Sequence, residues 1–76
     1  MLTDELKQLC LEIAATCAGN PLAMDMQIAR LRIITAWYLG RAGFPLDQAE
    51  LATEQVVGQT LDEIHGLQAA ARGTVQ

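Results

Sequence analysis

The segment from Pro21 to Ala42 constrains this chain most, because it reads as one helix with apolar side chains on two opposite faces. A helix in a small monomeric bundle needs a single wide apolar stripe. A helix with two stripes has to be sandwiched, either by elements of its own chain or by another chain. The sequence therefore predicts a helical protein in which this helix has neighbours on both sides.

Length and composition indicate a single all-α domain that spans residues 1–76. Hydrophobic residues make up 51% of the sequence and aromatic residues only 4%, so most of the apolar mass consists of aliphatic side chains. A domain of about 60 residues buries only about 60% of the surface that its unfolded chain exposes. A lone core of this size is marginal, and we therefore expect a homodimeric bundle.

The first two helices are predicted to form an antiparallel hairpin over residues 4–18 and 21–42. Thr3 is the expected N-cap, Gly19 the expected left-handed stop, and Pro21 occupies a first helical position. So short a connection places the two helices side by side. Counting outward from the loop midpoint predicts the contacts Leu2–Trp37, Leu6–Ile33, Cys10–Ala29, Ile13–Met26 and Cys17–Leu22.

This pairing leaves the second apolar stripe of residues 21–42 without a neighbour in the hairpin. We expect it to form a dimer or partner interface, and it consists of Met24, Ile28, Leu31, Thr35, Tyr38 and Leu39. The third helix could cover this stripe in a flat three-helix layer. It could instead close a triangular bundle and leave much of the stripe for another protomer.

The third helix is predicted over residues 48–72, after a bend at residues 40–45. Asp47 and Glu50 have the spacing of a capping box, with Leu46 and Leu51 placed as a hydrophobic staple. The predicted inward set is Ala49, Thr53, Val56, Val57, Thr60, Leu61, Ile64 and Leu67. Internal glycines weaken a helix, so a break is expected near Gly66. Residues 73–76 are predicted to form a loose tail.

No residue pattern in the chain points to catalysis, to a cofactor or to a bound metal. Cys10 and Cys17 lie too far apart along one helix for a disulfide and are predicted to be free thiols. Asp62 and His65 have the spacing of a solvated ion pair, but no nucleophile accompanies them. We therefore expect a protein that is not an enzyme.

The formal net charge of −4 has the wrong sign for a protein that holds a phosphate backbone, so we do not expect nucleic acid as a partner. No stretch approaches the length of about 20 apolar residues that a membrane span needs, and the N-terminus lacks the pattern of a signal peptide. These features predict a cytoplasmic protein.

One segment, residues 48–67, resembles the helix-turn-helix of phage-repressor-like DNA-binding domains, which commonly open Gln-x-x-Leu-Ala, as Gln48, Leu51 and Ala52 do here. The resemblance implies a DNA-binding transcriptional regulator. The chain departs from that motif at the turn, where Gln55 and Val56 replace an apolar residue and a glycine. Acidic residues in the second half also oppose contact with phosphate.

The preferred interpretation is a non-enzymatic interaction module that associates with itself and regulates or inhibits a larger, unidentified protein. Acidic helical proteins of this size include phage or mobile-element inhibitors, antitoxins, anti-activators and chaperones, which is an analogy from size and charge. Charged residues at a rim steer association with a partner. The expected contacts with such a partner are Arg41, Glu50, Glu54 and Asp62.

Overall fold

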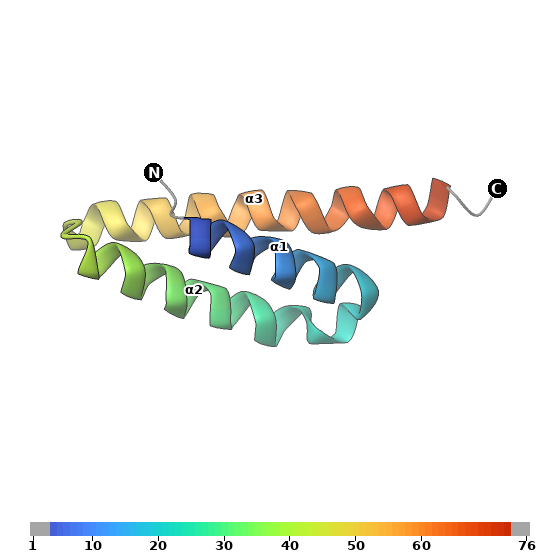
Figure 1. Cartoon of the computed structure of the whole chain (residues 1–76), viewed down its shortest axis with the longest axis horizontal. Coiled ribbons are helices and arrows are strands. Elements are labelled where there is room, and N and C mark those ends of the chain that lie inside the picture. The colour runs from blue at the N-terminus through green and yellow to red at the C-terminus, as the bar shows by residue number, and fades with distance from the viewer. Residues whose placement is uncertain (1–3, 74–76) are drawn as a thin grey trace.

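The computed structural model describes residues 4–73, which form three α-helices and one short 3₁₀ turn (Figure 1). Helix α1 spans Asp4–Gly19, the turn η1 spans Pro21–Ala23, α2 spans Met24–Arg41 and α3 spans Leu46–Gly73. The described residues contain no strand. The predicted all-α three-helix unit is therefore confirmed, whereas the Thr3 cap, the position of Leu2 and residues 74–76 lie outside the described range.

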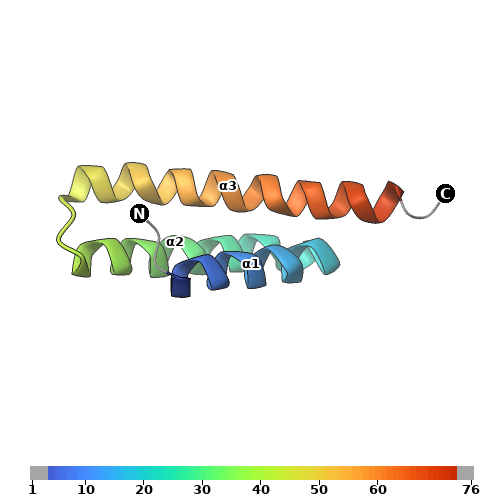
Figure 2. The same ribbon diagram turned by 45° about the horizontal axis from the view of Figure 1, so that its top comes forward.

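The three helices pack as a triangular bundle, because each helix contacts both of the others. Figure 2 shows α3 lying lengthwise along the pair formed by α1 and α2. The bundle is elongated, with principal extents of 48 × 22 × 19 Å. The last turns of α3 extend beyond the ends of α1 and α2 (Figure 1). Of the two arrangements open from the sequence, the structure has the triangular one.

The core lies along the axis of the bundle and consists mainly of small and aliphatic side chains. Helix α1 contributes the stripe expected of it, with Leu6, Ile13 and Cys17 buried together with Ala14. Most of the predicted inward set of α3 is also buried, namely Ala49, Thr53, Val56, Val57, Thr60 and Ile64. Leu67, also in the predicted set, is instead 39% exposed.

A Schellman motif ends α2 and sets the direction of α3. The backbone N–H of Phe44 donates to the carbonyl of Leu39 at 3.1 Å, and the N–H of Gly43 donates to the carbonyl of Gly40 at 3.1 Å. Gly43 has a φ of 90°, which a glycine adopts without the steric cost that a Cβ would bring. The bend expected at residues 40–45 is therefore a defined helix cap.

Two predicted helix boundaries need correction. Gly43 is the glycine with positive φ among the described residues, so Gly19 ends α1 without a left-handed conformation. Helix α3 begins two residues early, because the carbonyl of Pro45 accepts the N–H of Ala49 at 2.8 Å. Asp47 therefore lies inside the first turn, where its charge favours the helix N-terminus, and does not begin a capping box.

The glycines of α3 do not interrupt it. The helix runs through Gly58 and Gly66 without a break, so the predicted break near Gly66 is wrong. Glycine lowers helix propensity by only about 1 kcal/mol, and the buried face of the helix on either side outweighs that cost. Gly73 belongs to the helix and not to the tail.

Candidate interaction surface

Helix α2 is rotated relative to the expected hairpin register, so that its second stripe, named here the inner row, faces the core. Leu31, Thr35 and Leu39 are buried by the chain itself, while Met24, Ile28 and Tyr38 are half-buried. The prediction that this row forms an interface is therefore wrong for its three buried members. The expected contacts of Ile33, Met26 and Leu22 with α1 are wrong as well, since these side chains are exposed.

The physical reason lies in the connection and in the two rows of α2. Residues 21–23 form a 3₁₀ turn in which the N–H of Ala23 donates to the carbonyl of Asn20 at 3.0 Å. A 3₁₀ turn has about 3.0 residues per turn, so counting at helical spacing from the loop midpoint misplaces the following residues. The inner row carries no ionisable group except the Tyr38 phenol, whereas Arg30 interrupts the opposite face.

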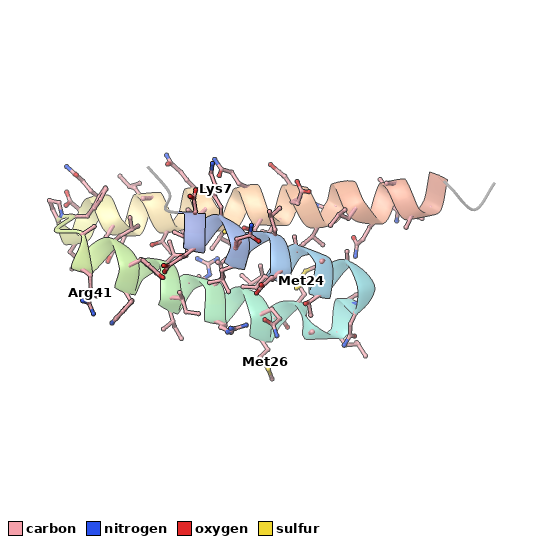
Figure 3. The ribbon with its side chains drawn as sticks, in the orientation of Figure 1. Lys7, Met24, Met26 and Arg41 are labelled. Atoms are coloured by element: carbon pink, nitrogen blue, oxygen red, sulfur yellow. The ribbon has the colours of Figure 1, made fainter. Side chains whose placement is uncertain are left out.

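The opposite face of α2, together with the turn η1 before it, exposes four large apolar side chains, which we call the outer row. Leu22 is 95% exposed, Met26 75%, Ile33 71% and Trp37 57%. Figure 3 shows the contrast between the two faces, because Met24 points toward α1 and Met26 points away from the bundle. The fold is thus closed around one face of α2, and the other apolar face has no covering element among residues 4–73.

The C-terminal end of the outer row carries an aromatic and cationic cluster. The guanidinium carbon of Arg41 lies 4.8 Å from the centroid of the Trp37 ring, a cation–π distance. The rings of Trp37 and Tyr38 meet edge to face, with centroids 5.5 Å apart. Arg41 was an expected partner contact, and the structure places it beside the exposed indole at this end of α2.

An open groove lies between α2 and the start of α3, beside the same end of the outer row. Its volume is about 620 Å³, and its lining is mostly apolar. The residues that line it are Arg32, Ile33, Ala36, Gly40, Phe44, Leu46, Ala49, Glu50, Thr53 and Glu54. Ala36 and Gly40 keep its α2 wall low, so a bound segment can approach the backbone closely.

Two predicted partner contacts, Glu50 and Glu54, line this groove together. Glu54 accepts a hydrogen bond from the Arg32 guanidinium in an ion pair that joins α3 to α2. Residues 4–73 contain no ion pair for Glu50. Asp62 is exposed further along α3 and does not line the groove. The structure therefore brings two of the four predicted contacts together, and Arg41 lies beside Trp37 of the outer row.

The sequence singles out Cys10, Cys17, Asp62 and His65 as reactive side chains outside the groove. Cys10 and Cys17 are free thiols, and burial raises the pKa of Cys17 above its ordinary value. In the described part of the chain, no ion pair joins Asp62 to His65, and no group of acidic, cysteine or histidine side chains could hold a metal. None of the described helices is both long and apolar enough to cross a bilayer.

Hydrogen bonds hold the side chains of Tyr38, Thr53 and Thr60 near the core, whereas the Thr35 hydroxyl makes none with the described residues. The Tyr38 hydroxyl donates to the Glu5 carboxylate, and this hydrogen bond is the main cause that raises the pKa of Tyr38, with desolvation and the Glu5 charge adding to it. Thr53 and Thr60 donate to backbone carbonyls of their own helix at 2.7 and 2.9 Å. Thr35 is fully buried, and its hydroxyl has no partner among the described residues.

The structure does not contain the helix-turn-helix that residues 48–67 resemble in sequence. That motif needs a turn between two helices, and this segment lies within the single helix α3. The side chains that the turn would separate are instead part of one continuous buried stripe.

Comparisons with known proteins add no relative to this description. No protein-family model matches the chain, and neither the curated proteins nor the solved structures contain a match. The proposals below therefore rest on the surface of the molecule itself.

Proposed function

We propose that this protein is a non-enzymatic protein–protein interaction module of the cytoplasm, which regulates or inhibits a larger protein by binding one of its helical segments. The observation that carries this proposal is the groove between α2 and α3. The groove is open, apolar at its walls and bordered by carboxylates. Grooves of this kind bind amphipathic helices, whose apolar residues at helical spacing enter the groove.

The charges around the groove favour a basic partner. Glu50 and Glu54 line the groove against the single cation Arg32, and the chain as a whole has a formal net charge of −4. Opposite charges at a rim raise the rate of association and select the partner. A segment that combines apolar residues on one face with lysine or arginine beside them matches this chemistry.

Two leucines near the start of α3 provide a matched test. Leu46 and Leu51 are 76% and 67% exposed, but only Leu46 lines the groove. Because both are exposed, aspartate at either position is expected to change the free energy of unfolding by less than about 0.5 kcal/mol. Wild type, Leu46→Asp and Leu51→Asp are immobilised, and proteins retained from a lysate of the source cells are identified by mass spectrometry.

We expect wild type and Leu51→Asp to retain the same larger protein and Leu46→Asp to lose it. Retention by all three variants, or by none of them, would contradict the proposal. The segment of this partner that binds the groove is then prepared as a peptide. We expect this peptide to bind the Glu50→Lys variant more weakly than it binds the wild type.

A further inference from the structure

We infer that the outer row of α2 is a self-association surface on which a second copy of this chain packs in antiparallel orientation. The outer row adjoins the groove and shares Ile33 with it, and self-association through this row goes beyond the proposed function. The exposed apolar area of this row is large for a small protein. The largest apolar patch on a monomeric protein covers about 300–600 Å², and four side chains that are 57–95% exposed along η1 and α2 are on that scale.

Two such patches facing each other approach the total area of about 1,000 Å² that a specific interface has to bury. A second copy of this chain is also available to cover the outer row wherever the protein is made. The triangular bundle leaves this face uncovered over the whole length of α2, so the face of a second α2 can lie along it.

The row is complementary to itself in the antiparallel orientation. Within α2, Met26 lies as far before the midpoint between residues 29 and 30 as Ile33 lies after it. A two-fold axis at that midpoint therefore places Met26 against the other copy's isoleucine. Leu22 in η1 and Trp37 in α2 lie toward the two ends of the row. The small side chain of Ala29 lies at the axis, where the helices approach most closely.

The charges on one flank of the outer row favour the antiparallel orientation. Asp25 and Arg32 lie on the same flank of the outer row, on opposite sides of the midpoint. Antiparallel pairing about this axis brings Asp25 of each copy near Arg32 of the other. On the other flank the Arg30 side chains of the two copies come close to each other at the axis, and each donates to Gln27 of its own helix at 3.4 Å. Antiparallel helix dipoles also attract each other.

The oligomeric state is measured by size-exclusion chromatography with light scattering over a series of protein concentrations. The variants are Met26→Asp on the outer row and Leu11→Asp, which replaces a leucine of α1 that is 54% exposed. We expect wild type and Leu11→Asp to have twice the mass of one chain and Met26→Asp to have the mass of one. A wild type that is monomeric at every concentration, or a dimer that Met26→Asp leaves intact, would overturn the inference.

Disulfide formation then tests the orientation. Ala29 and Ala36 are both exposed on this face of α2, but only Ala29 lies at the proposed axis. We expect oxidation to link Ala29→Cys into a covalent dimer and to leave Ala36→Cys and wild type as single chains. Equal cross-linking of both variants would indicate parallel pairing and overturn the antiparallel arrangement. Since Leu46→Asp leaves the outer row intact, it is expected to dimerise, which separates this inference from the proposed function.

Discussion

At the scale of single residues, the three buried threonines differ in one respect that determines their effect on stability. Thr53 and Thr60 satisfy their hydroxyls on carbonyls of α3, whereas the Thr35 hydroxyl is buried without a partner in the described chain. A buried polar group that lacks a hydrogen bond costs about 1–3 kcal/mol. The buried Thr35 hydroxyl therefore lowers the free energy of unfolding of the native protein.

Thr35→Val is expected to raise the free energy of unfolding by about 1–2 kcal/mol, because valine has nearly the same shape and removes the unpaired hydroxyl. Thr60→Val is the matched control. It removes a hydrogen bond that is made and is expected to lower the free energy of unfolding by up to about 1 kcal/mol. Urea denaturation followed by circular dichroism measures both changes, and equal changes of the same sign would contradict this assignment.

Tyr38 is expected to ionise at a higher pH in the folded protein than in the unfolded chain, because its hydroxyl donates to Glu5. The contribution of this bond to stability is complete below the pKa of the unfolded tyrosine, about 10, and is lost as pH rises through the higher folded pKa. Tyr38 is the only tyrosine, so phenolate absorbance during an alkaline titration reports on it alone.

Glu5→Ala is expected to bring the Tyr38 pKa back toward its ordinary value, whereas Glu63→Ala, on α3, should leave it raised. A titration curve that is the same for wild type and Glu5→Ala would show that the hydrogen bond to Glu5 does not control Tyr38.

At the scale of the elements, the glycines of this chain have opposite roles that depend on backbone conformation. Gly58 lies within α3, and a Cβ built there meets nothing within 4 Å. Gly58→Ala is therefore expected to raise the free energy of unfolding by about 0.5–1 kcal/mol. Gly43→Ala is expected to lower it by about 1 kcal/mol, because Gly43 has positive φ in the Schellman motif. Thermal unfolding of the two variants measures both effects, and stabilisation by Gly43→Ala would be inconsistent with this cap.

The sequence was sufficient to predict the helices but not the rotation of α2. In α1 and α3 most apolar residues at helical spacing lie on one face. The periodicity therefore predicts the buried stripe of each of these helices. In α2 two apolar rows compete for the core, and the choice depends on the 3₁₀ turn at Pro21–Ala23 and on packing against α3. The groove could not be predicted either, because Ile33 and Leu46 come together only through the Schellman bend.

At the scale of the whole molecule, the rotation of α2 decides which residues hold the bundle together and which are available to other proteins. The inner row closes a small core with α1 and α3. The outer row and the groove are left at the surface, on one side of the molecule and joined by Ile33, which belongs to both. Dimerisation and partner binding are thus expected to occur at adjoining surfaces.

The central claim, that the inner row and not the outer row of α2 is in the core, is tested most directly by thermal unfolding of Leu31→Asp and Ile33→Asp followed by circular dichroism. Leu31 is 0% exposed and Ile33 is 71% exposed, although they lie two residues apart in one helix. Because an unpaired charge is costly to bury, Leu31→Asp is expected to lose the cooperative transition. Ile33→Asp is expected to keep the helical signal and a cooperative transition. Loss of the fold in Ile33→Asp with its retention in Leu31→Asp would contradict the claim.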